Sequence, residues 1–146
     1  EDVDFWQVDL GLSPATPVSF TGGSDAGSNY IFFGDSDGFQ AVNPGGDVSR
    51  IQFGDLTASG TGVTDFAGKL LATVNVDITG ASNGDIFSVD LFGGATNNYF
   101  YSAAFDQEAV TLVNAPYEFQ VVPIPAAAWL LGAGLLGLVG LRRKSS

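Results

Sequence analysis

Alternation of apolar and polar residues with a period of two runs through most of the first 121 residues. In the clearest segment, 69–79, every second residue is apolar: Leu70, Ala72, Val74, Val76 and Ile78. This is the period of a β-strand, in which successive side chains point to opposite faces. Clusters of Gly, Asn, Asp and Ser separate the alternating segments and mark turns. The pattern predicts an all-β chain.

Nine or ten strands are expected, at a spacing of roughly 8–12 residues. The segments are 6–12, 16–20, 30–33, 39–42, 48–53, 69–79, 87–92, 99–105, 109–113 and 117–122. Arg50, within one of them, is expected to face solvent. No amphipathic helical pattern interrupts the series. We therefore predict an antiparallel β-sandwich over residues 1–121, with a β-barrel as the alternative.

Composition excludes several classes of function. Cys, His and Met are absent, so the chain has no disulfides, no thiolate nucleophile and no histidine general base. The net charge is −11, and outside residues 142–144 only Arg50 and Lys69 oppose 16 acidic residues. Such a surface repels nucleic acid and attracts cations such as Ca²⁺. With no acidic pair singled out for acid–base work, we expect no enzyme activity, and a carboxylate hydrolase is a remote alternative.

The C-terminal segment differs in kind from the rest of the chain. Residues 126–141 carry no charge and would rise about 24 Å as a helix, near the lower limit for spanning a bilayer. Pro123 and Pro125 precede this run, and Trp129 lies near its outer end. Three basic residues close it: Arg142, Arg143 and Lys144. The positive-inside rule makes that end cytoplasmic. We predict a transmembrane helix within a segment 122–146, with a buried core helix as the alternative.

A five-residue motif opens this segment: Val122, Pro123, Ile124, Pro125 and Ala126. With the apolar run and basic cluster, it resembles the VPLPA variant of the PEP-CTERM sorting signal, with Ile124 where Leu is usual. The resemblance implies export from a Gram-negative cell and recognition by an exosortase, a membrane cysteine protease that cuts near this motif. The domain 1–121 would then lie in the periplasm, or at the cell surface after sorting. Residues 66–74 and 84–89 resemble cohesin-like sandwiches, which implies an immunoglobulin-, cohesin- or jelly-roll-like fold.

The two ends of the chain carry two further expectations. The acidic start, Glu1, Asp2 and Asp4, is the reverse of a basic signal-peptide region, so we expect a mature or shortened chain. In the apolar run, Ala133 and Gly137 form a small-xxx-small pair that permits close helix packing. The alternative for this pair is that small residues are simply common in such tails.

Two groups of side chains are candidates for binding. Asp35 and Asp37, followed by Gly38, resemble the start of a Ca²⁺ loop to which Asp25 could contribute, although no Glu closes the loop. The alternative is a turn with solvated carboxylates. Four aromatic residues could form a carbohydrate platform, with a role in the core or sheet surface as the favoured alternative: Trp6, Tyr30, Tyr99 and Tyr101.

These observations favour a structural or interaction protein of the envelope, anchored by one helix. Its expected partners are membrane lipid, an exosortase-type protease, other envelope or membrane-complex proteins, or further copies of itself. The alternative function is a Ca²⁺- or carbohydrate-binding module of the extracellular matrix. No cofactor is expected other than Ca²⁺.

Overall fold

The computed structural model describes residues 2–93, 96–108 and 116–122. Within these ranges the strands are β1 (Phe5–Ser13), β2 (Ser19–Ser24), β3 (Gln40–Val42), β4 (Arg50–Leu56), β5 (Thr73–Asp77), β6 (Ile86–Leu91), β7 (Tyr99–Tyr101) and β8 (Tyr117–Gln120). Two three-residue 3₁₀ turns, η1 (Gly27–Asn29) and η2 (Pro44–Gly46), also lie in these ranges. The predicted all-β class is confirmed.

Every ladder between these strands is antiparallel. Six strands form a large sheet in which β3, β4, β1, β6 and β8 lie side by side in that order. The long central strand β1 pairs with β4 along one edge. Along its other edge it pairs first with β7 and then with β6. The strands β2 and β5 form a separate two-stranded sheet.

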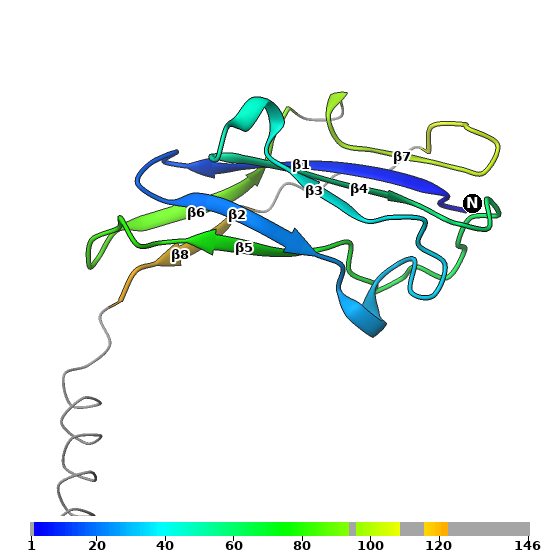
Figure 1. Cartoon of the computed structure of the whole chain (residues 1–146), viewed down its shortest axis with the longest axis horizontal. Coiled ribbons are helices and arrows are strands. Elements are labelled where there is room, and N and C mark those ends of the chain that lie inside the picture. The colour runs from blue at the N-terminus through cyan, green and yellow to red at the C-terminus, as the bar shows by residue number, and fades with distance from the viewer. Residues whose placement is uncertain (1, 94–95, 109–115, 123–146) are drawn as a thin grey trace, which may run out of the picture.

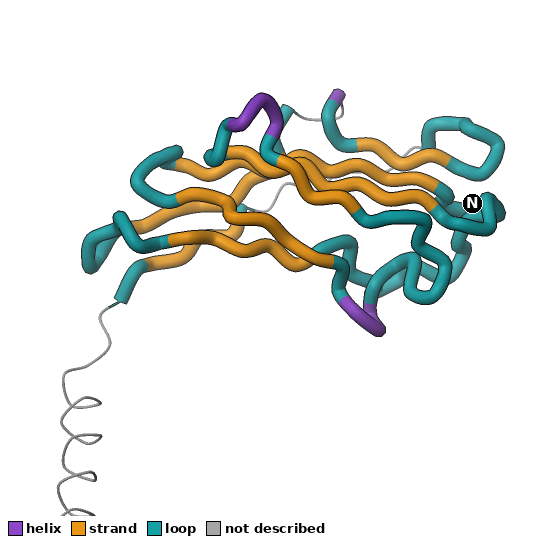
Figure 2. The backbone as a smooth tube through the Cα atoms, in the orientation of Figure 1, coloured by secondary structure: helices purple, strands orange, loops and turns teal. Residues whose placement is uncertain are grey.

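The small sheet lies across one face of the large sheet, as Figures 1 and 2 show. Inward-facing residues of both sheets meet between them and form the core. The largest fully buried side chains include Trp6, Phe20, Tyr30, Phe53 and Phe87. Removing this apolar surface from water is the main favourable term in folding. The alternating pattern therefore corresponds to a two-layered, sandwich-like arrangement with one face of the large sheet left outside.

Several predicted strands differ from the structure. The strand expected over 99–105 is limited to Tyr99–Tyr101, and the one expected over 48–53 runs from Arg50 to Leu56. The apolar run 30–33 is a turn rather than a strand, and its residues Tyr30, Ile31 and Phe32 are buried because the turn folds against the core.

The strand expected over 16–20 is β2, which runs from Ser19 to Ser24 and includes glycines that were expected to form a loop. In the segment 69–79 the strand is limited to Thr73–Asp77, although Leu70 forms an isolated parallel bridge with Tyr30. Leu70 and Ile78 are about half exposed.

Connections between the strands contain two cis peptide bonds, Ser13–Pro14 and Thr16–Pro17, both between β1 and β2. The beginning of β1 lies at the end of the molecule marked N in Figure 1, whereas the chain leaves β8 at the opposite end. No helix among the described residues is both long and apolar enough to traverse a bilayer. The predicted transmembrane helix and the strand 109–113 lie outside the described residues.

Candidate functional site

Three glutamines project from the outer face of the large sheet at its β3–β4–β1 side. Inner residues such as Trp6 and Phe53 are buried, so the residues that alternate with them face outward. Gly54 on β4 pairs with Gln7 of β1 on one side and with Gln40 of β3 on the other. This register places two amide side chains on either side of a residue that has none.

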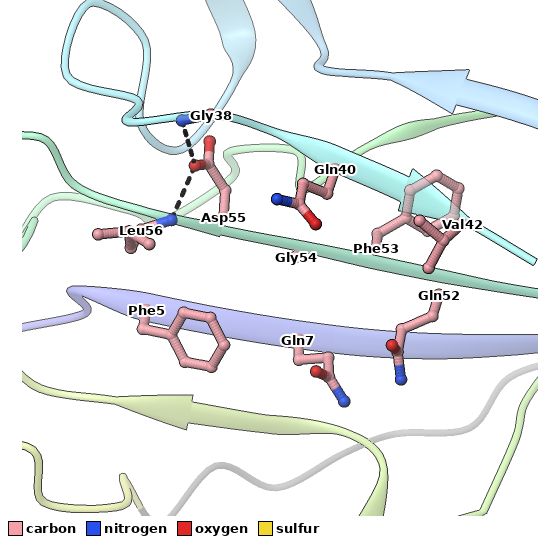
Figure 3. A pocket seen from close by; sticks show the side chains of 10 residues that line it. All are labelled: Phe5, Gln7, Gly38, Gln40, Val42, Gln52, Phe53, Gly54, Asp55 and Leu56. Atoms are coloured by element: carbon pink, nitrogen blue, oxygen red, sulfur yellow. Dashed lines mark hydrogen bonds between the residues drawn. The ribbon is translucent and has the colours of Figure 1, made fainter. Parts of the chain in front are cut away.

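Gly54 forms the floor of a hollow on this face. The hollow has a volume of about 260 Å³, and Gln52 and Val42 are among the residues that line it. Figure 3 shows the amide side chains of Gln7, Gln40 and Gln52 around it. A Cβ atom at Gly54 would lie 3.2 Å from the carbonyl oxygen of Trp6, so the backbone of β1 also approaches closely here. The missing side chain therefore creates the depth of the hollow.

The amides of the hollow are little used by the protein itself. Gln7 donates a long hydrogen bond of 3.4 Å from Nε2 to the carbonyl oxygen of Asn97. No hydrogen bond joins the side chain of Gln40 or Gln52 to another described residue. Each primary amide offers two donors and one acceptor. The hollow therefore presents both kinds of hydrogen-bonding group to a ligand.

Aromatic rings border the hollow on the β7 side. Phe5 lines it, and its ring centroid lies 5.8 Å from that of Tyr99 and 6.2 Å from that of Tyr101. The two tyrosine rings are 5.5 Å apart and nearly perpendicular. Burial raises the pKa of Tyr99, and the neighbouring Tyr101 adds to this, so its hydroxyl stays protonated to a higher pH than that of a free tyrosine. The three rings form a half-buried apolar ridge with polar hydroxyls.

Asp55 is the one charged residue among the described residues of the lining, and it is turned into the protein and only 2% exposed. Its Oδ1 accepts hydrogen bonds from the backbone N–H groups of Gly38 and Leu56, drawn in Figure 3. Its Oδ2 accepts from the hydroxyls of Ser36 and Tyr30, the latter at 2.6 Å. Burial, followed by the Asp55 carboxylate, raises the pKa of Tyr30 far above its usual range. With this carboxylate fully engaged, the hollow presents a neutral surface.

A buried ion pair lies beside the hollow on the same face. Asp9 of β1 is 0% exposed, and its Oδ2 accepts from the Nη2 of Arg50 and from the amide of Asn97. The Arg50 guanidinium lies 3.8 Å above the ring of Phe92. Arg50 lies on the outer face, as expected, but its side chain is only 25% exposed because it pairs with Asp9 and covers the ring of Phe92. Asp9 Oδ1 has no partner among the described residues.

The predicted Ca²⁺ residues are engaged in turns. Asp35 accepts hydrogen bonds from both the backbone N–H and the hydroxyl of Ser59. Asp25 accepts from the backbone N–H of Gly27, and the backbone N–H of Asp37 donates to Leu56. Within the described ranges no three acidic side chains gather as a metal site would require. Ca²⁺ binding stays a prediction.

The other candidate residues separate into three groups. All four aromatic candidates occupy positions of the favoured kind, since Trp6 and Tyr30 lie in the core and Tyr99 and Tyr101 lie on the sheet surface. The sorting motif, the Ala133–Gly137 pair and the basic cluster lie outside the described residues; only Val122, the first motif residue, is described, and it is exposed. Sequence reasoning missed the three glutamines. Their positions on the polar face of alternating segments were the available signal.

No known relative adds to this account. The chain matches no protein-family model, and no curated protein or solved structure is similar enough to count as a match. What the structure defines is an all-β protein with antiparallel sheets and a neutral hollow on the outer face of the larger one.

Proposed function

We propose that this chain is an exported protein of the bacterial envelope, anchored by its C-terminal segment and acting as a structural or interaction module. The observation that carries this proposal is the charge-free run 126–141, which lies between two prolines and three consecutive basic residues. A charged or polar residue within such a run would make insertion in a membrane costly. The finer fold that we propose for residues 1–121 is an immunoglobulin-, cohesin- or jelly-roll-like β-sandwich.

The acidic character of the remaining chain supports an extracytoplasmic location for it. Basic residues are concentrated after the apolar run, at 142–144, while 16 acidic residues precede it. The positive-inside rule then places the basic end in the cytoplasm. The motif 122–126 supports recognition by an exosortase-type protease, which would release or transfer the domain to the surface. Before that step the proposed partners are lipid and other envelope or membrane-complex proteins, with contact through Ala133 and Gly137.

Membrane extraction tests the anchor. The full chain, expressed in a Gram-negative host, should remain with membranes after washing in alkaline carbonate, because an inserted helix resists it while peripheral proteins detach. A variant that ends at Pro125 should leave the membrane fraction. Release of the full chain by the same wash would contradict the proposed anchor.

A binding module of the extracellular matrix is the second candidate function, and the neutral hollow over Gly54 favours its carbohydrate form. The hollow combines amides with aromatic rings, which is typical of small-ligand sites that have a few placed polar groups. The Ca²⁺ form is supported by the acidic turn at Asp35 and Asp37 alone.

Calcium binding has a direct thermal test. If Asp35 and Asp37 bind Ca²⁺, millimolar Ca²⁺ should raise the melting temperature, because a ligand of the native state stabilises it by mass action. Asp37→Ala should abolish that rise, whereas Asp77→Ala, at the exposed end of β5, should preserve it. If Ca²⁺ leaves the melting temperature of the unmodified protein unchanged, Ca²⁺ binding is refuted and the segment is a turn with solvated carboxylates.

A further inference from the structure

We propose that the hollow over Gly54 binds one ring of a neutral polysaccharide. This inference deepens the carbohydrate form of the second candidate function and rests on it. It does not depend on the membrane anchor, because every residue that it uses lies in β1, β3, β4 or β7.

The hydrogen-bonding groups of the hollow match sugar hydroxyls. A hydroxyl both donates and accepts, and a primary amide does the same with two N–H groups and one carbonyl. Gln7, Gln40 and Gln52 come from three adjacent strands and surround one floor residue. The amides of Gln40 and Gln52 are free of hydrogen bonds to other described residues, so a ligand need not displace an existing protein bond.

The apolar lining complements the C–H faces of a sugar ring. A pyranose carries C–H groups on its faces and hydroxyls around its rim, so it needs an apolar surface beside the amides. Phe5 supplies an aromatic ring, and Val42 and Leu56 are 47% and 42% exposed. Tyr99 and Tyr101 extend this surface beyond Phe5 with rings that each carry a hydroxyl.

The size of the hollow limits what it can hold. Pockets for drug-sized ligands usually measure ~300–1,000 Å³. At about 260 Å³ and open to the outside, this hollow accommodates a single ring and leaves the chain on either side of that ring in solvent. A polymer can therefore cross the sheet face with one residue seated over Gly54.

The charge distribution of the protein favours a neutral polymer as the ligand of the hollow. Among the described residues that line the hollow, Asp55 is the only ionisable one; it is buried, and both of its oxygens accept hydrogen bonds from the protein. None of these described lining residues is a cation that could pair with a uronate or phosphate group. The net charge of −11 repels a polyanion at longer range. These features together exclude acidic polysaccharides from the proposed ligands.

The position of the hollow suits a surface protein. It lies over the first half of β1, at the end of the molecule marked N in Figure 1. The chain leaves β8 at the opposite end. A glycan bound over Gly54 is thus separated from the point at which the C-terminal segment begins.

Affinity electrophoresis of the full chain tests this proposal. The gels contain hydroxyethyl cellulose, laminarin, dextran or galactomannan as neutral probes, and alginate as an acidic one. A polyoxyethylene detergent keeps the chain soluble, because alkyl glycosides carry a competing sugar headgroup. At least one neutral polymer should retard the protein, and alginate should not. Retardation by none of the four neutral polymers, or by alginate alone, would overturn the proposal.

Matched glutamine variants locate the binding surface. Gln40→Ala combined with Gln52→Ala should weaken binding by about ten-fold, since it removes hydrogen bonds to the ligand while breaking none within the described protein. Gln120→Ala changes the same residue type on β8, across the same sheet, and should bind like the original. Equal binding by all three proteins would show that the glycan sits elsewhere and would refute the hollow as its site.

The two proposals can fail separately. Loss of glycan binding by a chain that still resists carbonate extraction counts against the hollow alone. A chain that binds a neutral glycan over Gly54 but washes off the membrane counts against the anchor alone. Circular dichroism of the double variant should match the original, which separates lost contacts from a lost fold.

Discussion

At the scale of single residues, Asp55 organises the turn between η1 and β3. Its two oxygens accept hydrogen bonds from Tyr30, Ser36, Gly38 and Leu56, and the carboxylate is shielded from solvent. A buried charge is tolerated when its hydrogen-bonding capacity is satisfied in this way. The same bonds turn Asp55 away from the hollow, so one residue serves both the fold and the neutrality of the outer face.

Tyr30→Phe should destabilise the protein, because it removes the hydroxyl that donates to buried Asp55. Hydrogen bonds to charged groups contribute about 1.5–3 kcal/mol, and we expect a loss in that range. Urea denaturation at pH 7 measures it. Tyr117→Phe, which removes the hydroxyl of an exposed tyrosine, should change the free energy of unfolding by less than about 0.5 kcal/mol. An effect of similar size in both variants would contradict this role for Tyr30.

The raised pKa of Tyr30 also predicts a pH dependence. The folded state keeps this hydroxyl protonated, whereas the unfolded state loses the proton near pH 10. The stabilisation is therefore complete below about pH 10 and is lost as the pH rises above it. In that alkaline window the stability of the original protein should fall more steeply than that of Tyr30→Phe, by about 1.4 kcal/mol per pH unit. Parallel curves for the two proteins would be inconsistent with the assignment.

At the scale of elements, the contact between the two sheets depends on Gly23 of β2. A Cβ atom at this position would lie 2.3 Å from the carbonyl oxygen of Thr73 on β5 and 2.5 Å from the ring of Phe53 on β4. Both neighbours are held in place, one by the ladder between β2 and β5 and the other by the core. The absence of a side chain at Gly23 therefore sets how closely the small sheet approaches the large one.

Gly23→Ala should cost about 1–3 kcal/mol, the usual range for overpacking a tight interior. Ser19→Ala in the same strand adds no atoms and should be nearly neutral. Thermal unfolding of both variants measures the difference. A Gly23→Ala protein as stable as Ser19→Ala would mean that the sheets approach less closely than the structure has them.

The sequence predicts which segments contain strands better than it predicts where those strands begin and end. Apolar and polar residues alternate at 6–12, around 50 and at 87–91, and each of these segments contains a strand. The longest alternating segment, 69–79, is a strand only over Thr73–Asp77. The run 30–33 is different, since its apolar residues are buried within a turn that Asp55 holds from 25 residues further along the chain. Short apolar runs do not distinguish a strand from a buried turn.

The candidate site was less predictable than the fold for a related reason. Gln7, Gln40 and Gln52 become neighbours only because β1, β3 and β4 pair in a particular register. Register depends on contacts between segments that are distant in sequence, and a slip of one residue would turn each amide to the other face. The Arg50–Asp9 pair is another such case, joining residues 41 positions apart.

In the complete chain, the proposed glycan-binding face lies over the first half of β1, and the C-terminal segment, the proposed membrane anchor, follows β8. The acidic domain must then lie outside the cytoplasmic membrane, with Arg142, Arg143 and Lys144 inside. Every proposed encounter, with an exosortase, with envelope proteins or with a glycan, requires this orientation.

Protease accessibility in intact spheroplasts measures the orientation directly. Added protease should remove residues 1–121 while a cytoplasmic marker protein remains whole, and an epitope tag placed after Ser146 should stay protected until the membrane is disrupted. Full protection of the β-sheet domain in intact spheroplasts, followed by its digestion after lysis, would contradict the account.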